Sequence, residues 1–261
     1  MSNRRPSIHP SDRCSYCGEP LDQRVYFCLR CAKPHKHPDS LLPASMPTYE
    51  DNETKLRTKA GPAWTVYFVY LSVIAIGSLI SFEFWDEEGM EPFFLIVELS
   101  LLVTTLIFVI RFWSDVRPLI ARLGIFHPAT WIGLALLVPL LLLNYGYHNL
   151  LMEWLAIEDD DYMEYFSSSW GPILFICIMP AIVEELGFRG IIQHQFEKVV
   201  SPKVAIFAAS VAFSAAHFNM LSAPYLVLVG ILLGWMKWKT GSIYPSMVAH
   251  FLHNYIVVIH F

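Results

Sequence analysis

The chain has 261 residues, of which 55% are hydrophobic and only 16% are charged. Soluble domains carry about 25% charged residues, and the mean hydropathy here is +0.44. The composition therefore excludes an ordinary soluble domain and indicates an integral membrane protein. The formal net charge is −5 without a basic cluster, so we expect no nucleic-acid partner. The polar N-terminus lacks the short apolar core of a signal peptide.

The first feature in chain order is a set of four cysteines in two Cys-x2-Cys pairs, Cys14 with Cys17 and Cys28 with Cys31. Two such pairs offer four thiolates to one tetrahedral zinc ion. Because residues 1–37 are too few to build a hydrophobic core, the metal would supply the folding energy of this segment. We predict a structural, zinc-ribbon-like module that binds a protein partner or positions the chain.

Other interpretations of the module stay open at this point. The cysteines can instead form two disulfides, which requires an oxidising compartment, and His35 or His37 can replace a cysteine as ligand. Gly18 follows the second cysteine and suits the tight turn of a zinc knuckle. Residues 38–61 are polar and rich in proline, which predicts a linker.

The remainder, residues 62–261, is predicted to be an all-α, polytopic transmembrane bundle. Apolar stretches of about 20 residues can cross a bilayer as helices. About seven such stretches occur, at 63–82, 93–113, 130–147, 170–188, 203–218, 224–238 and 243–259. Segment 119–126 combines helical apolar spacing with basic residues, so we expect a helix along the membrane surface. Proline inside a span should free backbone carbonyls that neighbours must satisfy, at Pro139, Pro180 and Pro245.

Basic and acidic residues alternate between the connections. Acidic residues fill the connections 83–91 and 153–164, and Lys or Arg fills the others that carry charge. Because basic residues mark cytoplasmic connections, we expect a cytoplasmic N-terminus and an external C-terminus. The cysteine module then lies in a reducing compartment, which favours zinc over disulfides.

Several polar residues lie inside the apolar stretches. Glu184 and Glu185 are adjacent, and an ionised carboxylate in hydrocarbon is costly. Arg189 follows Glu185 at i+4, where the two can pair. His217 ends the fifth stretch, and the last stretch contains His250, His253 and Asn254. A lone intramembrane polar residue, such as Glu98 in the second stretch, is more often a packing residue, and Glu185 with Arg189 can be a structural ion pair.

Together these residues indicate hydrolytic chemistry. A carboxylate with a neighbouring histidine can deprotonate water. A histidine and an amide can donate hydrogen bonds to a developing oxyanion.

Three motifs occur in a fixed order: Glu184-Glu185-Leu-Gly-Phe-Arg189, Phe213-x3-His217 and His250-x3-Asn254. In this order they resemble the CPBP family, which comprises CAAX endopeptidases and bacteriocin-processing (Abi) proteins, over about residues 170–261. The resemblance implies an intramembrane glutamate-type endopeptidase acting on a membrane-associated or lipidated protein or peptide. It implies that Glu184 is the general base and acts with His217 on a water, while His250 and Asn254 stabilise the oxyanion. It further implies that Glu185, Arg189 and Phe213 support the site, and no active-site metal is expected.

Other functions remain open. The same family includes non-catalytic bacteriocin-immunity proteins, and a scaffold or a proton-relay transporter would also place carboxylates in the membrane. A metalloprotease is a further alternative, because a glutamate and two histidines can hold a metal. One difficulty concerns depth. The end of the fourth stretch places Glu184 near the cytoplasmic side, whereas His217 lies about 21 Å along the fifth stretch from Lys203.

Overall fold

The structure of the protein is a computed structural model that describes residues 13–14, 17–20, 28, 30–31, 49–82, 91–156 and 166–260. This described part folds into helices and contains no β-strand, which confirms the all-α class. His35, His37 and the acidic connections at 83–90 and 157–165 lie outside the described residues.

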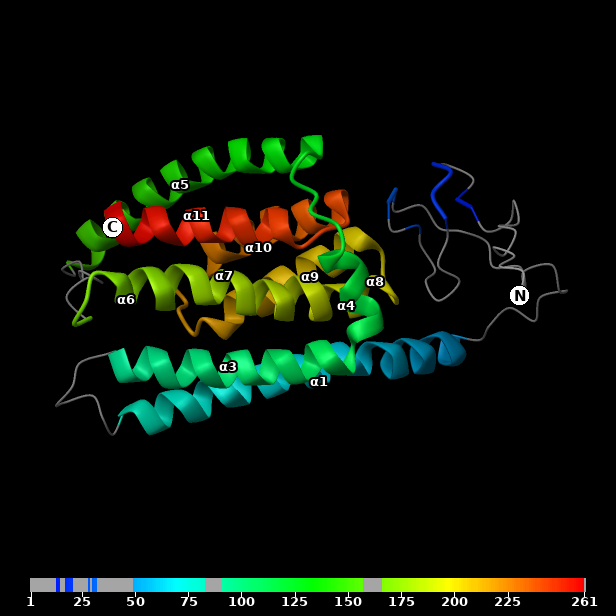
Figure 1. The fold of residues 1–261 in the computed structure, drawn as a ribbon, viewed down its shortest axis with the longest axis horizontal. Coiled ribbons are helices and arrows are strands. Elements are labelled where there is room, and N and C mark those ends of the chain that lie inside the picture. Colours follow the sequence, from blue (N-terminus) through cyan, green and yellow to red (C-terminus); the bar gives the residue numbers. More distant parts are fainter. Residues whose placement is uncertain are drawn as a thin grey trace, which may run out of the picture.

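The apolar stretches predicted from the sequence each overlap a helix (Figure 1). The first four long helices are α1 (Tyr49–Phe82), α3 (Glu91–Arg111), α5 (Pro128–Leu155) and the continuous helical run Trp170–Glu197, and each contains a window long and apolar enough to cross a membrane. The other helices are α4 (Trp113–Ile120), α9 (Pro202–Ala216), α10 (Ala223–Thr240) and α11 (Tyr244–His260). The number of spans stays a prediction.

The run Trp170–Glu197 is irregular in its backbone. It comprises α6 (Trp170–Pro172), the π-helical segment η4 (Ile173–Ile178), α7 (Met179–Glu184), the π-helical segment η5 (Glu185–Ile192) and α8 (Gln193–Glu197). π-Helical turns occur frequently at functional sites, and η5 begins within the pair of adjacent glutamates.

Two local expectations are wrong, and a third boundary differs. Segment 119–126 is no surface helix, because α4 ends at Ile120 and Gly124 adopts a left-handed φ of +65° that breaks helical geometry. Pro245 lies in the first turn of α11, where the missing N–H leaves no interior carbonyl unpaired. Helix α1 begins at Tyr49 and so extends back into the segment 38–61 that we expected to be a linker.

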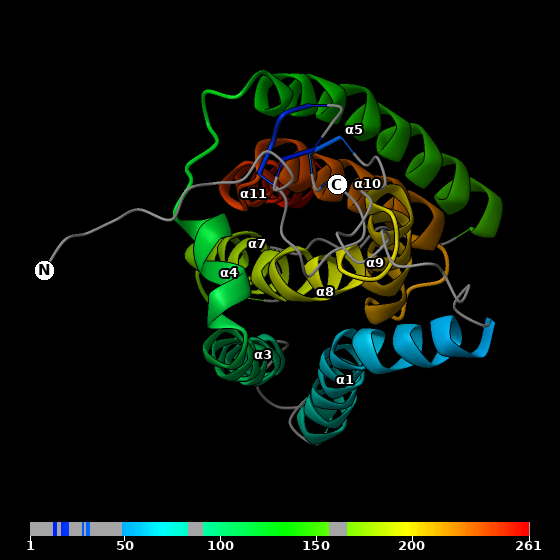
Figure 2. The same cartoon turned by 90° about the vertical axis from the view of Figure 1, so that its right-hand side faces the viewer.

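The helical run Trp170–Glu197 lies in the middle of the bundle. Figure 2 looks along the bundle and shows α7 and α8 between α1 and α3 on one side and α10 and α11 on the other. Helix α9 packs against α8 and α10, and α10 also contacts α5 and α11. Every other long helix therefore lies beside the central run or is joined to it by one intervening helix.

Small residues allow the helices to approach closely. A Cβ at Gly187 in η5 would collide with the ring of Tyr70, whose hydroxyl is hydrogen-bonded to Thr105. A Cβ at Gly230 in α10 would lie 2.8 Å from Cβ of Ser210 in α9. Close approach through small residues is what holds helices together in lipid, where apolar burial alone gives little driving force.

The depth difficulty disappears in this arrangement. Glu184 lies half-way along the run Trp170–Glu197, because the helix continues beyond Glu184 for about 20 Å at 1.5 Å per residue. The chain then turns, and α9 climbs back from Pro202 over about 22 Å before it ends beside His217. Glu184 and His217 therefore stand at nearly the same level, which removes the difficulty that straight spans confined to their apolar stretches would pose.

Polar residues continue the helix beyond the apolar stretch because each finds a partner. Lys237 Nζ of α10 lies 2.6 Å from Glu197 Oε2, with both side chains almost fully buried. Gln193 Nε2 donates to Glu197 Oε1 and to the carbonyl of Gly234. On the neighbouring face, Lys198 Nζ donates to Asp115 at 2.6 Å. Burial alone would raise the pKa of the Asp115 carboxyl, but hydrogen bonds from Lys198 and Gln195 hold that pKa below its usual value.

We expect Lys237→Met to lower the free energy of unfolding by about 3–5 kcal/mol, because it leaves the Glu197 carboxylate buried without its cation. Thermal unfolding of the purified protein in detergent measures this loss. Lys239→Met, at an exposed position of the same helix, is the control and should cost less than about 1 kcal/mol. Equal losses for the two variants would contradict the prediction.

Candidate functional site

The two adjacent glutamates face different surroundings. Glu185 is fully buried and its Oε1 accepts a hydrogen bond of 2.7 Å from Arg189 Nη1. This confirms the i,i+4 pair predicted from the sequence. The Glu184 side chain keeps 16% of its surface exposed, lines a cavity, and its Oε2 has no hydrogen-bond partner. Neighbouring residues on a helix point about 100° apart. The Glu185 carboxylate therefore lies among buried side chains, whereas the Glu184 side chain lies at the cavity.

His250 of α11 joins the two carboxylates. Its Nδ1 lies 3.0 Å from Glu185 Oε1 and its Nε2 lies 4.0 Å from Glu184 Oε2. Beside the Arg189 guanidinium Glu185 is ionised and only accepts hydrogen bonds, so Nδ1 of His250 carries the proton in this contact. His250 is 3% exposed and lies behind Glu184 rather than on the wall of the cavity.

Phe213 packs among the charged and imidazole groups. The Arg189 guanidinium lies 4.2 Å from the centroid of its ring, a cation–π distance. The same ring meets His217 and His250 edge to face, at centroid distances of 4.7 and 5.8 Å. Phe213 thus fixes the spacing between the first motif and both histidines.

His217 caps the C-terminal end of α9. Its Nδ1 lies 2.8 Å from the carbonyl of Phe213, which can only accept, so Nδ1 is the protonated nitrogen. In the neutral ring Nε2 then carries the lone pair. His217 lines the same cavity as Glu184, so the structure brings these two predicted residues to one space.

Asn254 is held by hydrogen bonds on both sides, to a side chain of its own helix and to a backbone carbonyl of the central run. Its Nδ2 donates to the carbonyl of Ile176 at 2.8 Å, and its Oδ1 accepts from His253 Nδ1 at 2.8 Å. His253 Nε2 in turn meets the Tyr225 hydroxyl at 2.6 Å. The carbonyl of Ile176 lacks its i+4 donor because Pro180 has no N–H. This confirms that Pro180 frees a carbonyl which a neighbouring helix must satisfy.

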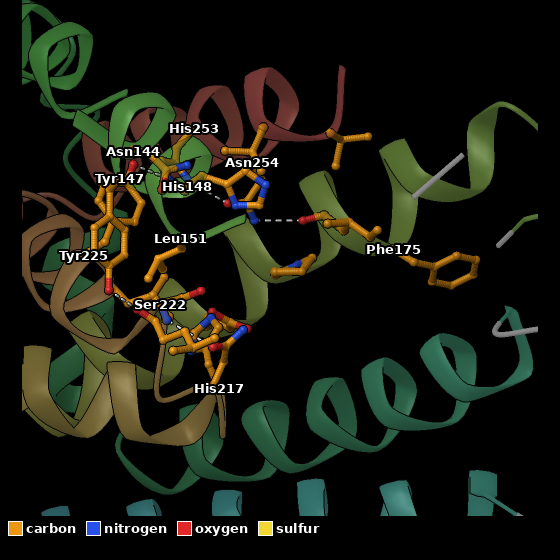
Figure 3. Close-up of a pocket in the computed structure, with 18 of the residues that line it drawn as sticks. Asn144, Tyr147, His148, Leu151, Phe175, His217, Ser222, Tyr225, His253 and Asn254 are labelled. Atoms are coloured by element: carbon orange, nitrogen blue, oxygen red, sulfur yellow. Dashed lines mark hydrogen bonds between the residues drawn. The ribbon is translucent and has the colours of Figure 1, made fainter. Parts of the chain in front are cut away.

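These groups surround a cavity of about 540 Å³. Figure 3 shows His217 on one side, Asn254 and His253 on another, and Phe175 at the far end from Asn144, Tyr147 and Tyr225. Sequence reasoning missed the contributions of α5 and α10, namely Asn144, Tyr147, His148 and Tyr225. Their only signal was a set of hydrogen-bonding side chains at the end of one apolar stretch, for Asn144, Tyr147 and His148, and at the start of another, for Tyr225.

Glu98 of α3 also lines the cavity, although the sequence favoured a packing role for it. Its side chain is nine-tenths buried, and its Oε2 has no hydrogen-bond partner. The signal was present as a lone carboxyl in an apolar helix, but nothing local told which way it faces.

The N-terminal cysteines form a separate cluster. The Sγ atoms of Cys14, Cys17, Cys28 and Cys31 all lie within 4.8 Å of one another and could hold a metal ion. The Cys14–Cys31 and Cys17–Cys28 sulfur distances are 3.6 and 3.5 Å, far longer than the roughly 2.05 Å of a disulfide. Gly18 has a φ of +70°, and its N–H donates to the carbonyl of Cys14. The tight turn expected at Gly18 is therefore present.

Known proteins share sequence with the segment that carries this site. Residues 166–256 match the sequence profile of the family described as Type II CAAX prenyl endopeptidase Rce1-like. The chain is 29% identical to YpbD of Bacillus subtilis (strain 168), an uncharacterized protein, over 151 residues that cover 54% of this chain and 74% of YpbD. No solved structure matches the chain.

The matched segment contains all three motifs and begins just before the central helical run. With its apolar helices, the chain is an integral membrane protein. Residues 166–256, which hold Glu184, His217, His250 and Asn254, thus match the Rce1-like family of type II CAAX prenyl endopeptidases, a family of membrane-embedded proteases.

Proposed function

We propose that this protein is an intramembrane endopeptidase of the CAAX-protease type, which hydrolyses a peptide bond in a membrane-associated or lipidated substrate. One observation carries the proposal. Of two adjacent glutamates, Glu185 is buried against Arg189 and His250, whereas Glu184 lines a cavity that His217 also lines and has one carboxylate oxygen, Oε2, without a hydrogen-bond partner. A structural ion pair would explain Glu185 and leave Glu184 unexplained.

In this proposal Glu184 and His217 activate water. A water between the Glu184 carboxylate and the lone pair of His217 Nε2 loses its proton to Glu184 as its oxygen attacks the scissile carbonyl carbon. The same carboxyl then gives the proton to the leaving amine, so no covalent enzyme intermediate forms. His250 is hydrogen-bonded to Glu185 and packs behind Glu184, with Nε2 4.0 Å from Glu184 Oε2.

Asn254 is the proposed donor to the oxyanion. Its amide has two N–H groups, of which one is bound to the Ile176 carbonyl, and the other is left for the substrate. The contact from His253 to Oδ1 fixes which end of the amide is the donor. The resemblance implies that His250 shares this role; because His250 lies behind Glu184 and off the cavity wall, we give the oxyanion to Asn254 alone in this proposal.

The shape of the cavity supports a peptide with an apolar attachment as substrate. Apolar side chains from α3, η4 and α11 line part of the wall, among them Phe94, Phe175 and Val257, and hydrogen-bonding side chains line the rest. A cavity of this kind suits a ligand with one polar and one apolar part.

We expect Glu184→Gln to lower kcat by about 10²- to 10⁴-fold, because an amide cannot accept the proton of the attacking water. Cleavage of a fluorogenic prenylated peptide by the purified protein in lipid vesicles measures the rate. Glu153→Gln, at an exposed position of α5, serves as the control and should cleave at the wild-type rate. Undiminished cleavage by folded Glu184→Gln would rule out the mechanism. A wild-type protein that binds the peptide without cleaving it would favour the immunity or scaffold alternative.

We further propose that the cysteine cluster holds a structural zinc ion. Tetrahedral zinc with Zn–S bonds of about 2.3 Å places its sulfurs about 3.8 Å apart, close to the 3.5 and 3.6 Å observed here. Burial raises the pKa of the Cys28 thiol to about 12, so a cation is needed to hold its thiolate at neutral pH. Such a site serves to fold the module, which then binds a partner.

Zinc content separates this site from a metalloprotease centre. We expect about one zinc per wild-type chain and none in the double variant Cys17→Ser/Cys28→Ser, measured by elemental analysis of the purified proteins. Peptide cleavage should survive in the double variant because its metal site is separate from Glu184. A full zinc complement in that variant would instead point to a metal held by Glu184 and the histidines.

The distribution of basic residues supports a cytoplasmic N-terminus. Helices α3, α8 and α10 all end at one end of the bundle, where α9 begins (Figure 1), and this end carries Arg111, Lys198, Lys203, Lys237 and Lys239. Basic residues mark the cytoplasmic side. Helix α1 starts at the same end and α11 finishes at the opposite one, which places the C-terminus outside in this proposal.

A further inference from the structure

Glu98 is the second carboxylic acid on the wall of the cavity, and α3 contributes it from outside the family-matched segment 166–256. Helix α3 packs against α7 and η5, which carry Glu184 and the rest of its motif. Figure 3 shows α3 passing the cavity on the side opposite α11. Glu98 therefore faces the space where Glu184 and His217 meet from a direction that none of the three motifs covers.

The polar side chains of the wall differ in whether their atoms are already engaged. The donors of Tyr147 and His217 bind the carbonyls of Leu221 and Phe213. Among the described residues of the wall, the buried side-chain atoms without a hydrogen-bond partner are Oε2 of Glu184 and Oε2 of Glu98. Both are acceptors.

A buried acceptor without a donor is costly, by about 1–3 kcal/mol. The proposed mechanism uses the Glu184 carboxylate to bind water. It gives no task to Glu98, whose side chain is 7% exposed in an otherwise apolar part of α3. The free acceptor of Glu98 therefore calls for a ligand that brings a donor.

A peptide is the ligand whose chemistry fits. Lipid chains carry no N–H donor, whereas every backbone amide in a peptide carries one that must be paired inside a membrane. An amide in the cavity offers its carbonyl and its N–H in opposite directions. With the scissile carbonyl toward Asn254 of α11, the N–H of that amide points toward α3, and in an extended chain so does every second N–H.

We propose that Glu98 is a substrate-binding residue, which accepts a hydrogen bond from a backbone N–H of the peptide. The inference rests on the proposed function but concerns binding rather than the chemical step. Loss of Glu98 therefore raises KM and leaves kcat close to the wild-type value.

The test measures binding separately from hydrolysis. A fluorescent prenylated peptide is titrated into purified Glu184→Gln protein, and its affinity is compared with that of the double variant Glu184→Gln/Glu98→Leu. We expect affinity to fall about tenfold in the double variant. A set of peptides, each N-methylated at one backbone nitrogen, then identifies the amide. One N-methylated peptide should bind Glu184→Gln about tenfold more weakly than the unmethylated peptide does. The double variant should bind that peptide and the unmethylated peptide with equal affinity.

Two further variants control for a loss of fold. Glu98→Gln keeps a carbonyl acceptor in the same place and should retain more affinity than Glu98→Leu. Thr105→Val removes another buried polar group of α3, two turns from Glu98 and outside the cavity. The double variant Glu184→Gln/Thr105→Val should bind the peptide with the same affinity as Glu184→Gln.

The proposal is overturned if Glu184→Gln/Glu98→Leu and Glu184→Gln bind the peptide with equal affinity. It is also overturned if every N-methyl group weakens binding to the two proteins by the same factor. If the wild-type protein cleaves the peptide while either result holds, the proposed function stands and only the role of Glu98 falls. If the wild-type protein neither binds nor cleaves the peptide, the proposed function falls as well.

Discussion

The arrangement of the bundle depends on one buried charge, the carboxylate of Glu185. A charge in this setting must be paired and hydrogen-bonded, and its partners come from two directions, Arg189 one turn along the same helix and His250 on α11. That requirement brings α11 against the central run, and the Arg189 guanidinium in turn lies on the ring of Phe213 in α9. Three helices are thus tied to one side chain, and the neighbouring Glu184 is left to face the cavity.

Near this centre several backbone carbonyls accept a hydrogen bond from a side chain of another helix. Asn254 satisfies the carbonyl that Pro180 leaves unpaired. Where α9 stops, Ser214 donates to the carbonyl of Ala223, and Tyr147 of α5 donates to that of Leu221. Unpaired carbonyls at membrane depth are tolerated only when protein covers them. The groups that shape the site are therefore also those that keep the helices in register.

Much of this could be predicted from the sequence because the signals are local. The apolar stretches, the i,i+4 pairing of Glu185 with Arg189 and the tight turn at Gly18 depend on residues near one another in the chain. The depth of Glu184 along its helix could not be predicted. Composition ends the apolar stretch at the first polar residues, although the helix itself continues. The helix continues to Glu197 only because Lys237, far along the chain, neutralises it. The direction of Glu98 likewise depends on how α3 packs against α7, which no local pattern encodes.

Helix α9 is short for a membrane, about 22 Å against a hydrocarbon thickness of about 30 Å. Several of its side chains point away from the bundle, among them Val204 and Phe207, which are 52% and 56% exposed. A short apolar helix beside lipid creates a hydrophobic mismatch, which the bilayer relieves by thinning around it. Since α9 ends at His217, the thinned region lies next to the cavity. Under the proposed function, such thinning would shorten the path of a peptide tethered at the headgroups and the hydrocarbon that water must cross.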